Sequence, residues 1–482
     1  MREGLNLDYG LLIPEYILGL TAVLIIAVDL FAPNTKKKTL PILAGAGLIV
    51  AFIVSLLYVD KKDDFAGLIF IDDYTTFFRC FFIAIAFATV VSSAQYVEDR
   101  LTHHAEYYAL ILFSTVGAIF MAAAKELLTA YIALELLSFS LYVLVSYAKK
   151  STKSNEGGMK YMLLGAFASA LLLYGITFIY GTSGSTSYSE IAAAFSEGTS
   201  DFTFGTLAGL TLIVAGLGFK VAAVPFHMWT PDAYEGAPLP ITGYLAATSK
   251  AAGFAMLLRL FSGALLPVID DWQFMIAALA AVTMIVGNLL ALQQHNLKRL
   301  LAYSSIGQVG YMLMAITALD ADVTSAMLLH MTGYMITNMA AFTAVIAYHN
   351  LTGAEEVSDF RGMSDRAPVL AGCLAAALFS LAGMPLFAGF LTKFIFFQSV
   401  ASNDFYWLAG VGVFASLISL YYYLYVMREM YVTPTEVTSR LSFPLYLQGA
   451  AVVLTIGVFF VGLYPQPLYE VTESVARVLF AT

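Results

Sequence analysis

The sequence predicts an all-α polytopic membrane protein with about fourteen transmembrane helices, since one span needs roughly 20 apolar residues. Of its 482 residues, 60% are hydrophobic and only 12% are charged, whereas ordinary soluble domains are about 25% charged. Long apolar runs recur along the whole chain, separated by short polar links. The first run lacks a basic preceding region and a small-residue cleavage site, so we expect it to remain as a span.

The apolar runs predict the positions of the individual spans. They lie at 11–32, 39–58, 73–95, 106–124, 127–148, 157–180, 205–226, 239–262, 272–293, 299–319, 323–348, 367–400, 405–430 and 445–464. The tail 465–482 alternates apolar and acidic residues, and we expect it to lie in the membrane interface. Lys and Arg collect in one set of loops, such as 36–38 and 149–153, while acidic runs such as 270–271 lie in the other set. The basic loops should therefore be cytoplasmic, with both termini on the periplasmic or extracellular side.

Two predicted spans contain a proline at matching positions. Pro225 interrupts the seventh span, and Pro385 follows Leu-Ala-Gly-Met in the twelfth. Proline removes a helical hydrogen bond, and such a break persists in a membrane only where the freed backbone groups face protein or a hydrated cavity. The breaks lie five spans apart and each has a lysine nearby, which favours two inverted five-helix repeats with discontinuous helices 7 and 12. Ordinary proline kinks are the alternative.

Several ionisable residues lie inside predicted spans, where a charge costs at least about 2.5 kcal/mol and indicates a functional site. They are Glu135, Lys220, Lys250, His330 and Lys393, from spans five, seven, eight, eleven and twelve. Lys220 is the candidate partner of Glu135, and a fixed ion pair that only joins two helices is the structural alternative. Because histidine titrates near neutral pH, the five residues together predict a proton relay along the membrane midplane.

Two polar stripes accompany these residues at helical spacing. Ser304, Gln308 and Tyr311 share one face of the tenth span, and His330, Tyr334, Thr337 and Asn338 share one face of the eleventh. Simple interhelical hydrogen bonding is the alternative for both. Other charged residues are weaker candidates for a functional site, because Arg79, Lys160 and Arg259 are expected to extend toward a membrane interface.

The composition also excludes several kinds of chemistry. Only Cys80 and Cys373 are present, too few for a protein-bound iron–sulfur cluster. The chain has no G-x-G-x-x-G motif, no Walker loop and no carboxylate–histidine group with metal-ligand spacing. We therefore expect no cofactor, metal or nucleic acid bound to this chain, and the lipid bilayer as its surroundings.

Four stretches carry a family resemblance. GLGFKVAAVPFHMWTPDAYEGAP, SKAAGF, the LEL around Glu135 and HNLKRLLAYSSIGQVGYM resemble subunit N of the proton-translocating NADH:quinone oxidoreductase, bacterial respiratory complex I. The similarity covers nearly the whole chain. FHMWTPDAYEGAP separates subunit N from the related L and M subunits, and Lys393 fits N and L better than M, which carries an acid there. Lys125–Leu127 departs from the family's usual Asp-Leu-Leu before the fifth helix.

The resemblance implies a location, partners and a division of the chain. It implies helices 1–3 at 1–105, one repeat at 106–262, its inverted counterpart at 263–431, and a last helix with the tail at 432–482. The relay is implied at Glu135, Lys220, Lys250 and Lys393. Flavin, iron–sulfur clusters, NADH and quinone would bind other subunits, and M-, K-, J- and L-like subunits would connect this chain to the peripheral arm in the bacterial cytoplasmic membrane. An Mrp-type cation/proton antiporter subunit is the competing interpretation.

Overall fold

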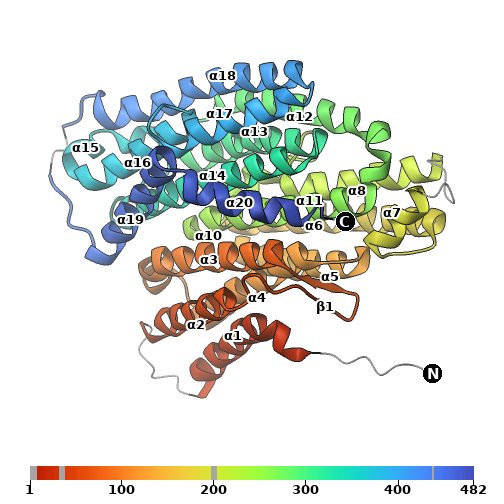
Figure 1. Cartoon of the computed structure of the whole chain (residues 1–482). Helices are drawn as coiled ribbons and strands as arrows, with labels where there is room; N and C mark the ends of the chain where they lie inside the picture. Colours follow the sequence, from red (N-terminus) through yellow and green to blue (C-terminus); the bar gives the residue numbers. More distant parts are fainter. Residues whose placement is uncertain (1–7, 32–37, 197–203, 437–438, 482) are drawn as a thin grey trace.

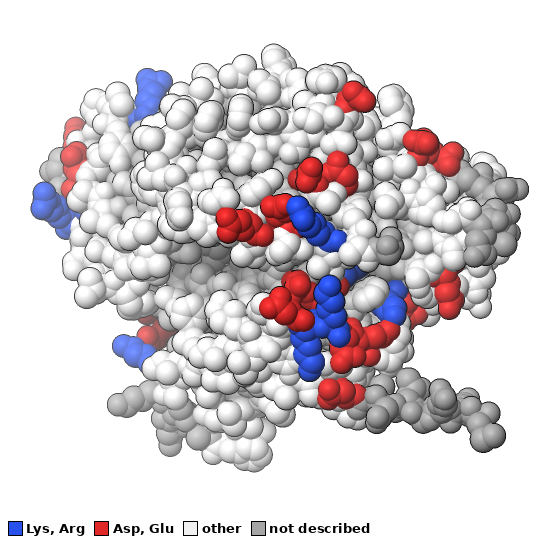
Figure 2. Space-filling view, in the orientation of Figure 1, with Lys and Arg blue, Asp and Glu red and all other residues white. Residues whose placement is uncertain are grey.

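The computed structural model describes residues 8–31, 38–196, 204–436 and 439–481; Lys36 and Lys37 of the predicted basic loop lie outside them. Most of these residues form long helices that run side by side (Figure 1). Within the described ranges, 11 helices are long and apolar enough to cross a membrane. The face in Figure 2 carries few charged groups over much of its area, and large apolar side chains such as Leu20, Phe167 and Leu417 are exposed. A multi-pass membrane protein is therefore confirmed.

The N-terminal part contains four long helices and one small sheet. Its elements are η1 (Tyr9–Leu12), α1 (Ile13–Phe31), α2 (Thr39–Leu56), β1 (Asp63–Phe65), β2 (Ile69–Ile71), α3 (Asp73–Arg100) and α4 (His104–Ala123). The strands β1 and β2 pair antiparallel, so the all-α prediction is wrong in this detail. The polar link between α2 and α3 folds back because Gly67 adopts a φ of 73° and its N–H donates to Asp64 Oδ1 at 2.7 Å.

The middle of the chain contains the first predicted break. Its elements are α5 (Leu127–Val145), α6 (Thr152–Ser183), α7 (Tyr188–Ser196), α8 (Phe204–Val221), α9 (Trp229–Gly236), α10 (Leu239–Tyr244), the π-helical η2 (Leu245–Ser249), α11 (Lys250–Leu260), the π-helical η3 (Phe261–Leu265) and η4 (Leu266–Val268). The helix breaks where Pro225 predicts, between the end of α8 and the start of α9. Trp229 Nε1 donates to the carbonyl of Phe219 at 2.9 Å, so the freed backbone is satisfied within the protein.

The C-terminal part also contains long helices and one break. Its elements are α12 (Ile269–Ala291), α13 (Leu297–Thr317), α14 (Ala321–Thr352), η5 (Val357–Phe360), α15 (Met363–Arg366), α16 (Pro368–Ala382), α17 (Ala388–Ser402), α18 (Tyr406–Tyr431), α19 (Leu445–Leu463) and α20 (Gln466–Val478). The second break lies between α16 and α17, around Pro385. Helix α20 packs against α14 and α3; its predicted place in the membrane interface stays a prediction.

Two arginines that were expected to reach an interface are instead buried in ion pairs. Arg79 Nε lies 2.6 Å from Glu15 Oε1, and Arg259 donates to both carboxylate oxygens of Asp72 at 2.6 and 2.9 Å. The expectation is wrong because each guanidinium has a carboxylate within reach on a neighbouring segment. Each arginine is therefore paired inside the protein and does not extend to an interface. The pairs tie α1 to α3, and α11 to the start of α3.

Candidate functional site

The sequence-predicted ionisable residues are buried inside the helical bundle, apart from Glu135. The exposed fractions are 2% for Lys220, 1% for Lys250, 1% for His330 and 5% for Lys393, whereas Glu135 is half-buried. Three lysines this deeply buried require polar partners, because an unpaired buried charge is costly. The helices α13 and α14 lie between the two broken helices, and both are almost completely buried.

Glu135 and Lys220 each contact a serine rather than each other. Lys220 Nζ donates to Ser138 Oγ at 2.8 Å, and the Ser169 hydroxyl donates to Glu135. Among the described residues, no ion pair within 4.0 Å joins Glu135 to Lys220. The predicted direct pair is therefore not formed in this conformation, and the fixed helix-pinning pair is not formed either.

A small cavity lies between these two serines. Its volume is about 10 Å³, and Ser138, Ser169, Tyr142 and Lys220 are among its lining residues. A single water needs roughly 10–15 Å³ and two or more polar partners. The cavity therefore has the size and the polar lining to hold one water between the Lys220 side and the Glu135 side.

Lys250 lies directly after a π-helical turn, a feature that often marks functional sites. Its ammonium donates to the Ser305 hydroxyl on α13 and lies 5.5 Å from the centre of the Tyr234 ring. The neighbouring hydroxyls of Thr248 and Ser249 are buried and make no hydrogen bond within the described chain. Lys250 therefore lies in a hydroxyl-lined environment between α9 and α13.

Lys393 occupies the second break. Its ammonium donates to the carbonyl of Leu381, which the break leaves free, at 2.8 Å, and lies 5.0 Å from the centre of the Tyr311 ring. The chain turns there because Gly383 adopts a φ of 82°. The start of α17 approaches α16 so closely that a Cβ on Gly389 would lie 1.8 Å from the carbonyl oxygen of Ser380.

The two polar stripes meet at one cavity next to Lys393. Gln308 from α13, His330, Tyr334 and Thr337 from α14, and Lys393 from α17 all line this space of about 10 Å³. His330 Nδ1 lies 3.0 Å from Thr392 Oγ1, while His330 Nε2 and the Tyr334 hydroxyl are buried without a partner in the described chain. The cavity again has room for about one water with several polar contacts.

The remaining stripe residues have different surroundings. Ser304 shares a hydrogen bond with the Tyr423 hydroxyl on α18, and Asn288 Nδ2 lies 3.5 Å from the Tyr311 hydroxyl. Asn338 donates to the carbonyl of Tyr334 in its own helix at 3.1 Å. Asn338 is not among the residues that line the cavity.

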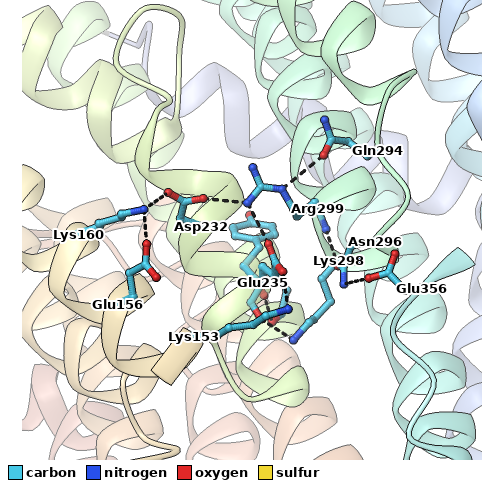
Figure 3. Close-up of polar contacts among 12 residues, drawn as sticks. Lys153, Glu156, Lys160, Asp232, Glu235, Gln294, Asn296, Lys298, Arg299 and Glu356 are labelled. Carbon is cyan, nitrogen blue, oxygen red and sulfur yellow. Dashed lines mark hydrogen bonds and ion pairs between the residues drawn. The ribbon is translucent and has the colours of Figure 1, made fainter. Parts of the chain in front are cut away.

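An ion-pair cluster lies at one end of the same helices, on α6, α9 and α13 (Figure 3). Arg299 Nη1 contacts Asp232 at 2.8 Å and Glu235 at 2.9 Å, and Lys160 contacts Asp232 at 2.8 Å. Burial alone raises the pKa of Asp232, but the hydrogen bonds from Lys160 and Arg299 outweigh it and hold the pKa below its ordinary value. Lys160 therefore belongs to this network rather than extending to an interface alone.

The cluster continues on both sides of Asp232 and Glu235. Lys153 contacts Glu235 at 2.8 Å, and Lys298 donates to the carbonyl of Glu235 at 2.5 Å. Tyr234, whose ring faces Lys250, lies between the two acids in α9. The network thus fixes the short helix that positions this ring.

Sequence reasoning missed the hydroxyl partners of the charged groups, namely Ser138, Ser169, Ser305 and Thr392. Ser138 follows Glu135 by three residues, so helical spacing places both on one face and could have identified it. Ser169 and Ser305 come from other helices, and only the packing brings them to Glu135 and Lys250.

The family model for the transmembrane part of NADH:quinone oxidoreductase and Mrp antiporters matches residues 124–419, which is more than half of the chain. This chain belongs to that family. All five ionisable residues described above lie within the matched range, as do both broken helices. The match to the NADH:quinone oxidoreductase/Mrp antiporter family therefore includes the part of the molecule that contains the buried polar residues.

Individual relatives cover nearly the full length. NADH-quinone oxidoreductase subunit N of Moorella thermoacetica is 40% identical over 96% of this chain and 97% of its own length. A subunit in the structure of respiratory complex I from Thermus thermophilus with bound aureothin is 28% identical, with a TM-score of 0.79 over 95% of this chain and 99% of that one. A chain of the Mrp complex from a Dietzia species has a TM-score of 0.83 at 18% identity, over 97% and 98%; it shows the shared fold alone.

Proposed function

We propose that this chain is the proton-translocating, antiporter-like subunit N of an NADH:quinone oxidoreductase. The observation that carries the proposal is the 40% identity, over nearly the full length of both chains, to a protein named NADH-quinone oxidoreductase subunit N. The buried lysines, the glutamate and the histidine supply groups that can bind and release protons. In this role the chain is a non-redox part of an enzyme whose electron transfer takes place in other subunits.

The proposed path runs laterally, from Glu135 through Lys220 and Lys250 to His330 and Lys393. Ser138 accepts a hydrogen bond from Lys220, Ser169 donates one to Glu135, and the Ser305 hydroxyl accepts one from Lys250. Each cavity of about 10 Å³ would hold one water that passes a proton between neighbours. The row ends where Lys393 and His330 share the second cavity.

Electrostatics drive the transfer in this mechanism. When Glu135 approaches Lys220 the charged form of the lysine is stabilised, and when the two separate it releases its proton. Their present separation by two serine hydroxyls corresponds to the state in which the pair is open. A shift of one pKa unit equals about 1.36 kcal/mol, so a few linked steps are needed to work against a proton-motive force.

The finer topology is part of the proposal. Fourteen spans, with repeats at 106–262 and 263–431 inverted relative to each other, are supported by the two broken helices, each with a buried lysine. The basic loops would face the cytoplasm and both termini the periplasm or exterior. M-, K-, J- and L-like subunits would flank this chain, and flavin, iron–sulfur clusters, NADH and quinone would bind elsewhere in the complex.

An Mrp-type antiporter subunit has the same fold and is the second candidate. Co-purification separates the two proposals, because subunit N should co-purify with flavin- and iron–sulfur-containing subunits and an antiporter subunit should not.

The proton role is tested in the purified complex reconstituted into vesicles. Lys220→Ala and Glu135→Ala should abolish NADH-driven proton uptake while the complex still assembles. A chain whose charges only hold helices together predicts normal pumping and lower assembly for the same variants.

A further inference from the structure

A large groove lies on the outer surface, away from the buried polar row. It has a volume of about 900 Å³ and is bounded by α2, the C-terminal half of α3, the start of α4 and the start of α19. Ile42 is 70% exposed and Ile49 is 47% exposed, so the groove opens toward the surroundings of the helices. Most of its inner wall is apolar, with Ala46, Val91 and Ala94 among the lining residues, while Gln95, His104 and Tyr108 add polar groups.

The length of the groove matches one leaflet of a bilayer. Its lining extends along α2 from Lys38 to Ile49 and along α3 from Asp99 back to Phe87. At 1.5 Å per helical residue these stretches are about 17 and 18 Å long, and half of the hydrocarbon core is about 15 Å. A transmembrane helix of another protein would occupy the full thickness of about 30 Å, whereas an acyl chain ends at the midplane. The groove therefore fits a lipid better than a partner helix.

The charges at the mouth of the groove indicate which head group fits. Lys38, Glu98 and Asp99 line this end, and Lys38 Nζ lies 4.0 Å from Glu98. The lysine can bind a phosphate, while two carboxylates repel a head group that carries only negative charge. A primary ammonium has N–H groups that can donate hydrogen bonds to carboxylates, whereas a quaternary ammonium has no N–H to donate. Tyr446, across the groove, is the kind of residue enriched at membrane interfaces.

We infer that this groove binds one zwitterionic phospholipid with a primary-amine head group, such as phosphatidylethanolamine. The phosphate contacts Lys38, the ammonium contacts Glu98 and Asp99, and an acyl chain lies between α2 and α3 as far as Ile49 and Phe87. The lipid would fill the space between the N-terminal helices and the start of α19, joining the two ends of the chain. This site does not depend on the proton path.

Photo-crosslinking of the intact purified complex in nanodiscs tests this inference. Three lipids with a diazirine in the middle of one acyl chain are compared, with ethanolamine, choline or glycerol head groups, and the labelled peptides are identified by mass spectrometry. The ethanolamine lipid should label the 38–49 and 87–99 peptides several-fold more than the other two. A second groove of about 280 Å³, lined by Phe81, Ile336 and Leu454 among other uncharged residues, is the internal control and should be labelled equally by all three.

Two variants separate the head-group contact from the groove itself. Glu98→Gln with Asp99→Asn should reduce ethanolamine labelling to the choline level, and Ala94→Trp should block labelling by every lipid. Equal labelling of the wild-type groove by all three lipids overturns the inference. So does an unlabelled groove beside a labelled control groove, which would show that a neighbouring subunit covers it. Both of these outcomes are read on the wild-type complex, so the test does not depend on either variant assembling.

Discussion

The Lys220 ammonium donates a 2.8 Å hydrogen bond to the Ser138 hydroxyl, although Glu135 lies one helical turn from Ser138 on the same face of α5. The carboxylate is bound by Ser169 on α6 instead. The acid and the base are thus held apart by two neutral hydroxyls, with a small polar cavity between them.

Ser138→Ala should impair proton pumping while the complex still assembles. The change leaves the buried Lys220 ammonium without its hydrogen-bond partner, which costs about 1–3 kcal/mol and drives the lysine toward deprotonation or toward Glu135. The rate of NADH-driven proton uptake in vesicles should fall about fivefold or more, since 1–3 kcal/mol corresponds to roughly 5–150-fold.

Ser140→Ala is the matched control for this prediction. Ser140 is on the same helix, is buried, and donates only to the carbonyl of Leu136 in its own helix at 2.9 Å. Pumping at the wild-type rate in Ser138→Ala, or an equal loss in both variants, would contradict the role given to Ser138.

Gly389→Ala should lower the thermal unfolding midpoint of the complex. The added methyl would collide with the Ser380 carbonyl, so α17 must move away from α16 and overpacking of this kind costs about 1–3 kcal/mol. Gly372→Ala in α16 is the control, because its Cβ would meet no atom within 4 Å. Thermal unfolding of the complex compares the two, and equal midpoints would show that the close approach at Gly389 is unnecessary.

Breaking the buried pair of Arg259 and Asp72 should strongly destabilise the protein. Removing one partner of such a pair typically costs about 3–5 kcal/mol, because it leaves the other charge buried and unpaired. Arg259→Met and Asp72→Asn should each lower the unfolding midpoint, and the double variant should recover part of the loss. Additive losses in this double-mutant cycle would mean that the two residues act independently.

The ion-pair cluster should make wild type more stable than Asp232→Asn, and this difference in unfolding midpoint should disappear in acid. The pKa of Asp232 is held below its ordinary value by Lys160 and Arg299, against the effect of burial. A carboxyl with a depressed folded-state pKa stabilises the fold fully above its unfolded pKa, about 3.9, and this stability is lost as pH falls through the folded pKa. The midpoint difference between wild type and Asp232→Asn should be constant from about pH 5 to 8 and shrink below about pH 4. A difference that shrinks between pH 6 and 8 would be inconsistent with this assignment.

The sequence predicts the helices and the two breaks well because both depend on local physics. Twenty apolar residues in a row and a proline within them have few structural solutions in a membrane, and α8 and α16 end where Pro225 and Pro385 indicate. The hairpin after α2 was missed because its six strand residues are too few to show a period. The two π-helical turns around α11 leave no pattern in the residue types.

The sequence predicts the charged residues of the candidate site, but it does not predict their hydrogen-bond partners. Lys220, Lys250 and Lys393 stand out because a lysine inside a predicted membrane span is costly. Ser305 does not, since a serine in a membrane helix commonly bonds to its own backbone, and only the packing of α11 on α13 brings it to Lys250. The buried ion pairs of Arg79 and Arg259 were also not predicted, because the acids Glu15 and Asp72 come from distant segments of the chain.

If the buried residues from Glu135 to Lys393 conduct protons sideways through the membrane, Lys250 is the link between the Glu135–Lys220 end and the His330–Lys393 end. The most direct test is the number of protons translocated per NADH oxidised by the complex with Lys250→Met in sealed vesicles. This ratio should fall clearly below the wild-type value in fully assembled complex. A wild-type ratio in that variant would contradict this role of Lys250.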